Sequence, residues 1–89
     1  MFYYVYVLLS EKDKKCYVGY TENLKLRFEE HQKGRASSTK NRRPLQLIYS
    51  EACLDRKDAM RREKYLKTSY GNRFLKSRLK SYSTGCKSL

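Results

Sequence analysis

Two short hydrophobic runs near the N-terminus constrain the fold of this chain most. Residues 2–9 (FYYVYVLL) are aromatic, β-branched or aliphatic throughout, and residues 16–20 (CYVGY) repeat this character after a polar segment. Both runs are too short for a helix and rich in residues typical of strands. They predict an antiparallel hairpin with a central first strand and a loop of about six residues. Gly19 is expected to let another group approach the backbone closely.

A helix is predicted to follow the hairpin. A side-chain cap is available from Thr21 or Asn23, the apolar residues then recur at helical spacing, and Gly34 is expected to end the helix. Residues 45–54 (LQLIYSEACL) come after a proline, and their side chains are expected to alternate between two faces. This pattern predicts a third strand.

Two further helices are predicted after this strand. Asp55 is a candidate cap for a helix over residues 56–69, because acidic groups are favourable at the positive end of a helix. Residues 70–72 (YGN) are expected to interrupt it. A last, basic helix is predicted over residues 73–82.

The composition is that of a small, strongly basic domain. Because 89 residues are too few for two cores, one domain is expected over residues 1–82, with a flexible tail over residues 83–89. Lys and Arg number 21 against 9 Asp and Glu, a net charge of +12. Such an excess favours a polyanionic partner, nucleic acid first and an anionic membrane second. Hydrophobic residues make up 39% of the chain, which excludes a disordered basic tail.

The chain lacks the sequence signals of membrane insertion, secretion and structural zinc binding. No run approaches the roughly 20 apolar residues that span a bilayer, and the first residues lack the basic region of a signal peptide. A cytoplasmic protein is therefore expected. The three cysteines have no CxxC spacing and His31 is the only histidine, so a structural zinc site has too few clustered ligands.

Basic residues in two segments are candidate contacts to nucleic acid. Residues 35–43 (RASSTKNRR) form a polar, cationic loop, and the predicted last helix is also basic. These side chains either contact phosphate groups or belong to a solvated surface. The basic candidates are Lys40, Arg42, Arg43 and Arg73, and Asn72 next to Arg73 is a further candidate for nucleic-acid binding.

Glu63 lies in the apolar stripe of its predicted helix. With Ala59 at 0° on a helical wheel, Glu63 falls at about 40° and Leu66 at about 340°. An unpaired carboxylate there costs on the order of several kcal/mol, so Glu63 must have a cationic partner or bind a metal ion. A salt bridge to an arginine such as Arg27 and a divalent-metal site both satisfy this requirement, and position alone does not choose between them.

Tyrosine is unusually frequent, with nine residues, and Tyr4, Tyr6 and Tyr17 lie in the predicted hairpin. Most tyrosines are expected to pack in the core and to find partners for their hydroxyl groups. A tyrosine can also hold and deprotonate water when a metal or an arginine lowers its pKa. Tyrosine, arginine and glutamate together can therefore support phosphodiester hydrolysis.

The order of these residues resembles the GIY-YIG nuclease domain. The triplets YVY (residues 4–6) and YVG (residues 17–19) are separated by ten residues. The second triplet is followed by the pattern T-x-N-L-x-x-R-x-x-x-H-x-x-G over residues 21–34, and Glu63 stands on a later helix. The match runs from about residue 2 to about residue 78. The chain is most similar to small, single-domain bacterial members and also resembles the N-terminal nuclease domain of UvrC.

The resemblance implies an α+β fold, with a small three-stranded antiparallel sheet flanked by helices, and metal-dependent cleavage of nucleic acid. Tyr17 would then be the residue that activates water, and Tyr6 would assist or share that role, so the general base is not assigned between them. Arg27 would hold and neutralise the scissile phosphate. Glu63 would bind a single Mg²⁺ or Mn²⁺ ion that stabilises the leaving oxygen.

Two further positions are carried over from the family, and others depart from it. His31 matches a position near the phosphate in relatives, and Asn72 matches a polar residue that follows the glutamate in some of them. Tyr4 replaces the glycine of the first triplet, and isoleucines are replaced by valines of similar volume. Tyr20 stands where UvrC has a lysine, so one cation is missing from the expected phosphate site.

Two functions of different class follow from these expectations. The first is a metal-dependent endonuclease on DNA, selective for structure as in repair or recombination, or targeted by a partner protein. The alternative is a non-catalytic nucleic-acid-binding domain of the same fold, on structured RNA. A membrane-surface protein is not favoured, because the chain lacks a long amphipathic basic helix with large apolar residues. The sequence does not determine an oligomeric state.

Overall fold

The described part of the structure, a computed structural model of the 89-residue chain, is residues 1–82. The tail predicted over residues 83–89 lies outside the described residues. The elements follow in the order β1 (Tyr3–Ser10), β2 (Cys16–Thr21), α1 (Leu24–Gln32), a 3-10 turn η1 (Lys40–Arg42), β3 (Leu45–Cys53), α2 (Arg56–Leu66) and α3 (Ser69–Arg78).

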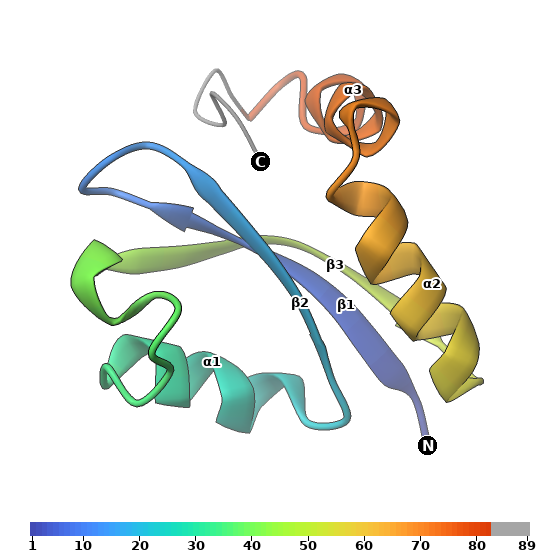
Figure 1. The fold of residues 1–89 in the computed structure, drawn as a ribbon, viewed down its shortest axis with the longest axis horizontal. Helices are drawn as coiled ribbons and strands as arrows, with labels where there is room; N and C mark the ends of the chain where they lie inside the picture. The colour runs from blue at the N-terminus through green and yellow to red at the C-terminus, as the bar shows by residue number, and fades with distance from the viewer. Residues whose placement is uncertain (83–89) are drawn as a thin grey trace.

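β1 is the central strand of a three-stranded antiparallel sheet with the order β2-β1-β3. Tyr6 in β1 lies opposite Gly19 in β2 and Ser50 in β3. The helices cover the sheet from two sides, with α1 on one face and α2 and α3 on the other (Figure 1). The predicted α+β fold, a small antiparallel sheet flanked by helices, is confirmed.

Both faces of β1 are buried, and its residues alternate between two hydrophobic clusters. Val5 and Val7 pack on the face of α2 and α3, together with Ala59 and Leu66. Tyr6 belongs to the cluster on the other face, beneath α1. Because a strand covered on both faces has no solvated side, its sequence reads as a continuous hydrophobic run. No helix within residues 1–82 combines the length and the apolar character needed to cross a membrane.

The first helix begins and ends where the sequence predicts, and the loop after it is partly buried. The side chain of Asn23 accepts a hydrogen bond from the Leu26 backbone N–H at 3.0 Å, so Asn23 is the cap. Gly34 follows the helix with a φ of 78°, a conformation that favours glycine. In the loop, Thr39 is fully buried, and Ser10 Oγ donates to the Arg42 carbonyl at 2.6 Å.

The boundary between the last two helices differs from the prediction. Residues 70–72 do not interrupt a helix but lie within α3, which Thr68 caps by accepting a hydrogen bond from the Gly71 N–H at 3.2 Å. A Cβ atom at Gly71 would collide with the Tyr65 carbonyl and the Leu66 backbone. The glycine therefore permits α3 to pack tightly against the end of α2, and this packing role was mistaken for a helix break.

Candidate active site

Gly19 allows two tyrosines to meet on the α1 face of the sheet. A Cβ atom at Gly19 would lie 2.5 Å from the Tyr6 hydroxyl oxygen and 3.1 Å from Cε2 of Tyr17. The two tyrosine ring centroids are 6.4 Å apart. The close approach that the sequence predicts at Gly19 is therefore made by Tyr6, whose ring lies across the glycine of the second triplet.

His31 packs behind the two tyrosines and is fully buried. Its Nε2 lies 3.0 Å from the Tyr6 hydroxyl, and its Nδ1 lies 2.7 Å from Oγ1 of Thr39. Its ring centroid is 5.3 Å from that of Tyr17. Tyr6, His31 and Thr39 therefore form one hydrogen-bonded chain that runs from β1 through α1 into the loop.

The electrostatic state of His31 follows from its surroundings. Burial, and then the positive charge of Arg27, lower the pKa of His31 below its ordinary value of 6.5. The imidazole is therefore neutral near pH 7, so one ring nitrogen donates and the other accepts. The ring is fully buried and contacts Tyr6, which is itself 1% exposed, so a phosphate at the surface does not contact the histidine directly.

Arg27 connects the buried tyrosine to the surface. Its Nη1 donates to Oε1 of Glu30 at 2.9 Å, and about a third of each side chain is exposed (35% and 34%). Burial raises the pKa of the Tyr6 hydroxyl, and a hydrogen bond with Arg27 acts in the opposite direction. Interactions with Glu30 and Tyr6 raise the pKa of Arg27, so its positive charge is permanent.

Glu63 lies on α2, which packs on the other face of the sheet from the tyrosine pair. Its side chain is 18% exposed, and Lys67 Nζ donates to its Oε2 at 2.9 Å. The structure gives Glu63 a cationic partner, one of the two alternatives from the sequence, but this partner is Lys67 and not an arginine such as Arg27, which pairs with Glu30. The negative charge of Glu63 also contributes to the raised pKa of Tyr6, so the carboxylate and the tyrosine belong to one electrostatic environment.

The donors at Glu63 fit a metal ion whose coordination is completed by water and substrate. Within residues 1–82, no three His, Cys, Asp or Glu side chains gather into a metal-binding group. Mg²⁺ is often held by only one or two protein carboxylates, together with waters and phosphate oxygens. Lys67 engages Oε2 of Glu63, which leaves Oε1 as the donor for such an ion.

An arginine-lined pocket of about 390 Å³ opens next to Arg27. Its lining residues are Tyr20, Thr21, Glu22, Asn23, Arg27 and Arg56. Arg56 is the first residue of α2, and its Nη2 donates to the Tyr20 hydroxyl at 3.5 Å. Arg56 was not among the site residues predicted from the sequence. The feature that marks it is a cation in the first turn of a helix, where the helix dipole favours acidic residues.

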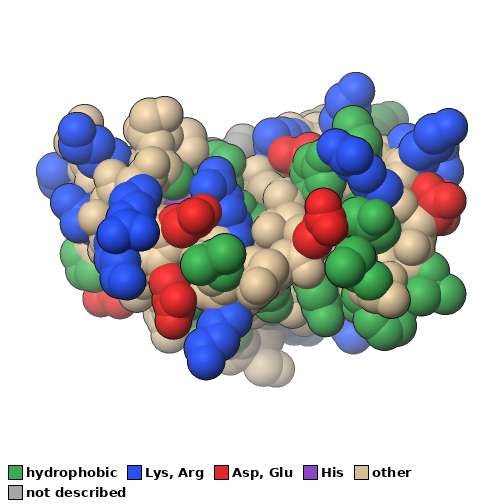
Figure 2. Space-filling model, turned by 90° about the horizontal axis from the view of Figure 1, so that it is seen from below, with side chains coloured by type: hydrophobic (Ala, Val, Ile, Leu, Met, Phe, Trp, Pro, Cys, Tyr) green, Lys and Arg blue, Asp and Glu red, His purple; other side chains and the backbone are tan. Residues whose placement is uncertain are grey.

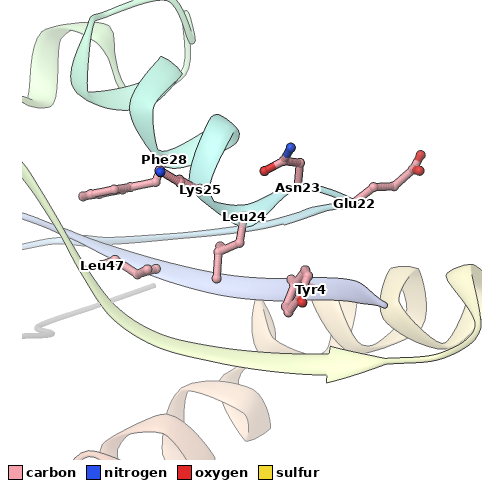
Figure 3. Close-up of a pocket in the computed structure, with 7 residues that line it drawn as sticks. All are labelled: Tyr4, Glu22, Asn23, Leu24, Lys25, Phe28 and Leu47. Carbon is pink, nitrogen blue, oxygen red and sulfur yellow. The ribbon is translucent and has the colours of Figure 1, made fainter. Parts of the chain in front are cut away.

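A larger, apolar cavity of about 570 Å³ adjoins this pocket at the turn between β2 and α1. Leu24 and Phe28 of α1, Leu47 of β3 and Tyr4 of β1 line it (Figure 3). Glu22 and Asn23 line both hollows. The side chain of Tyr4, which replaces the family glycine, therefore lies on the same face of the sheet as that of Tyr6.

The predicted nucleic-acid contacts are not brought together in one place. Lys40 is exposed in η1, Arg42 pairs with Asp13 at 3.2 Å, and Arg43 donates to the Lys40 carbonyl at 3.0 Å. Arg73 lies on α3, across the sheet from η1 (Figure 1). Figure 2 shows Lys and Arg side chains at both ends of one face, with acidic side chains between them.

Asn72 is half-buried on α3, and Arg73 beside it is exposed. The Oδ1 atom of Asn72 is buried and has no hydrogen-bond partner among the described residues. The guanidinium of Arg73 lies 5.0 Å from the ring centroid of Tyr70. A buried polar atom without a partner is unfavourable, so the position of Asn72 is not explained by its hydrogen bonds.

Comparisons with known proteins identify the family. The family model of the GIY-YIG catalytic domain matches residues 2–82. A UPF0213 protein of Staphylococcus haemolyticus is 43% identical over 67 residues, which cover 74% of this chain and 80% of that protein. A UPF0213 protein of Natronomonas pharaonis is 39% identical over 84 residues, 93% of this chain and 95% of that protein.

A solved structure agrees with these matches. The solution NMR structure of a UPF0213 protein from Bacillus halodurans is 34% identical and superimposes with a TM-score of 0.54. The match covers 86% of this chain and 84% of that one. The paired triplets, the arginine and histidine of α1 and the glutamate of α2 thus stand in a domain of the expected architecture, and this chain belongs to the GIY-YIG family of nuclease domains.

Proposed function

We propose that this protein is a divalent-metal-dependent endonuclease that hydrolyses phosphodiester bonds in DNA and selects its substrates by their structure. Membership of the GIY-YIG family supplies the reaction class, and nucleases of this family generally use divalent metals. The observation that carries the proposal is the chain from Tyr6 through His31 to Thr39, flanked by Arg27 and Glu63.

The proposed proton acceptor is Tyr6 together with His31. Tyr17, the more exposed tyrosine, holds the attacking water. Tyr6 takes the water proton while its own hydroxyl proton passes to Nε2 of His31, so the water oxygen becomes the nucleophile that forms the new bond to phosphorus. Thr39 orients the imidazole through Nδ1. This role suits Tyr6 because it is the tyrosine of the pair that is hydrogen-bonded to the histidine.

Arg27 is proposed to hold the phosphate that is cut. Its guanidinium carries a permanent charge, is partly exposed and interacts with Tyr6. A guanidinium placed there neutralises the negative charge that develops on the non-bridging oxygens as water attacks. Its fork of donors also fixes the phosphate against the tyrosine pair.

Glu63 is proposed as the protein ligand of the metal ion. A divalent cation bound at this carboxylate supplies positive charge to the leaving oxygen. Lys67 holds the carboxylate by one oxygen and thereby orients the other. Lys67 is half exposed, so it can move away from Glu63 without disturbing the core.

Selection by nucleic-acid structure is proposed because the basic surface is expected to contact phosphate groups and not base edges. The chain carries 21 Lys and Arg residues, and the candidate site combines arginines with tyrosines. Contacts from such residues to phosphates position a strand but do not read its sequence. Branches, flaps or ends are therefore the proposed targets, with DNA favoured over RNA, and a partner protein is a second source of targeting.

The test is a cleavage assay on a substrate panel. Labelled linear, flap, four-way and single-stranded DNA and RNA are incubated with the protein in Mg²⁺, Mn²⁺ or EDTA. Metal-dependent nicking by the wild type, lost in Glu63→Ala and kept in the matched exposed variant Glu29→Ala, is the expected result. Binding across the panel without any cutting would contradict the proposal and favour a non-catalytic nucleic-acid-binding domain.

A further inference from the structure

Two arginines from different helices converge on the 390 Å³ pocket. Arg27 comes from α1 and Arg56 from the first residue of α2. Two guanidinium groups repel each other, and Glu22 is the one carboxylate among the described lining residues that faces both of them. Arginine is also the side chain whose donors best match the oxygens of a phosphate group.

Arg56 shares the pocket with Glu22, whose charge acts on it, but no hydrogen bond or ion pair to a carboxylate fixes its guanidinium within the described residues. A cation in the first turn of a helix opposes the helix dipole. Within residues 1–82 Arg56 forms no ion pair, and its contact is the long hydrogen bond to the Tyr20 hydroxyl. Most of the five N–H donors of this guanidinium are therefore available to a ligand.

The alternation of side chains along β2 separates Arg56 from the tyrosine pair. Tyr20 packs against the cluster on the face of α2, whereas Tyr6 and Tyr17 belong to the cluster on the face of α1. Successive residues of a strand point to opposite faces. Because Tyr20 holds Arg56, this guanidinium lies on the opposite side of the β2 edge from Tyr6 and Tyr17, on the same helix as Glu63.

We propose that the pocket between Arg27 and Arg56 binds a phosphate group of the nucleic-acid strand that neighbours the phosphate being cut. Arg56 is then a binding residue that fixes the position of the strand, and Tyr20 orients it. The inference rests on the proposed function, because it takes the site of Arg27 as the place where the strand is cut. It adds a second phosphate contact on the other side of the β2 edge.

The first test measures binding without cutting. Glu63→Gln is the parent protein, EDTA is present, and fluorescein-labelled single-stranded and flap DNA are the probes. Arg56→Gln is expected to weaken binding about tenfold and to lower the slope of log affinity against log salt by about 1. The matched control Arg61→Gln removes an exposed arginine that pairs with Asp58 on the same helix, and its affinity is expected to change less than about twofold. Equal effects of the two variants would overturn the proposal.

The second test locates the phosphate. A neutral methylphosphonate replaces one phosphate at a time along the probe. At one position, different from the cleaved bond, the replacement is expected to weaken binding about tenfold in the parent protein but to have no further effect in Arg56→Gln. The proposal would be contradicted if the methylphosphonate weakened binding by the same factor in both proteins at every position. It would also be contradicted if the effect were lost in Arg56→Gln only at the phosphate that is cut.

Steady-state cleavage separates binding from chemistry. In the background of the wild-type Glu63, Arg56→Gln is expected to raise KM about tenfold and to leave kcat unchanged, and a fall in kcat instead would overturn the binding role. A protein that shows the coupling but cuts no substrate would support this phosphate site and refute the proposed nuclease. A protein that cuts DNA but shows no coupling would refute this site and leave the nuclease standing.

Discussion

The Tyr6 hydroxyl lies 3.0 Å from Nε2 of His31, and the histidine side chain is completely buried. Thr39 satisfies the second ring nitrogen at 2.7 Å, so the imidazole is held from both sides. A neutral histidine in this position can accept a proton from the tyrosine without contacting the substrate itself. The relationship makes the two tyrosines of the site chemically different, although their rings are near neighbours.

The difference between the tyrosines can be measured with phenylalanine variants. Tyr6→Phe removes the link to His31 and is expected to lower kcat by at least about 100-fold, the usual contribution of general base catalysis. Tyr17→Phe is expected to have a smaller effect, because the link to His31 remains. The exposed Tyr65→Phe serves as the control for loss of a hydroxyl. A larger loss of kcat in Tyr17→Phe than in Tyr6→Phe would assign the base to Tyr17.

The buried histidine also makes folding stability depend on pH. The pKa of His31 is lowered by burial, so the unfolded chain binds a proton at a higher pH than the folded one does. Stability from this group is therefore fully present above the unfolded pKa of about 6.5 and is lost as the pH falls below it. Urea unfolding between pH 7.5 and pH 5 is expected to show this decline. The same titration of His31→Gln should be nearly flat, and a similar decline in that variant would assign the effect to other groups.

Glu22 is expected to weaken the binding of nucleic acid. Its carboxylate lines the same pocket as Arg27 and Arg56, and its negative charge contributes to the raised pKa of Arg56. Glu22→Gln removes one exposed charge that repels phosphate, so DNA binding is expected to tighten by about threefold at low salt. Fluorescence anisotropy at low and physiological salt measures the change. Unaltered or weaker binding at low salt would show that Glu22 does not face the bound strand.

Local hydrophobic patterns predicted most of the fold correctly, because each strand is marked within its own sequence. The helix boundary at Gly71 was missed because the need for a glycine there comes from the end of α2, not from the local sequence. The burial of Glu63 was predictable from the helical wheel, but its partner was not. The ion pair with Lys67 is local in sequence, whereas Arg27 is occupied by Glu30.

The roles of the site residues were harder to predict from the sequence than the strands and helices. These roles depend on which face of each strand packs against which helix. Arg56 enters the site only because β2 turns its Tyr20 toward the start of α2. His31 has the spacing of an apolar residue on α1, and its hydrogen-bond partners come from β1 and from the loop that follows α1. Such contacts across the fold leave no periodic pattern in the sequence.

Two carboxylates of the fold are expected to respond differently to the same substitution. Glu51 accepts hydrogen bonds from Arg62 at 2.8 and 2.9 Å and from the Tyr49 hydroxyl at 2.7 Å. Burial alone would raise the pKa of Glu51, but these bonds outweigh it and hold the pKa below 4.5. Glu51→Gln is therefore expected to lower the free energy of unfolding by about 1–3 kcal/mol.

Glu63→Gln is expected to leave the stability of the metal-free protein unchanged or slightly higher. The substitution removes a half-buried charge and keeps its shape, and a pair with an exposed lysine contributes less than about 1 kcal/mol. Urea unfolding in EDTA measures stability, and nicking in Mn²⁺ measures activity. Glu51→Gln should lose stability but still cut DNA, whereas Glu63→Gln should stay folded and lose cutting. A large loss of stability in Glu63→Gln would instead make its pair with Lys67 a structural element.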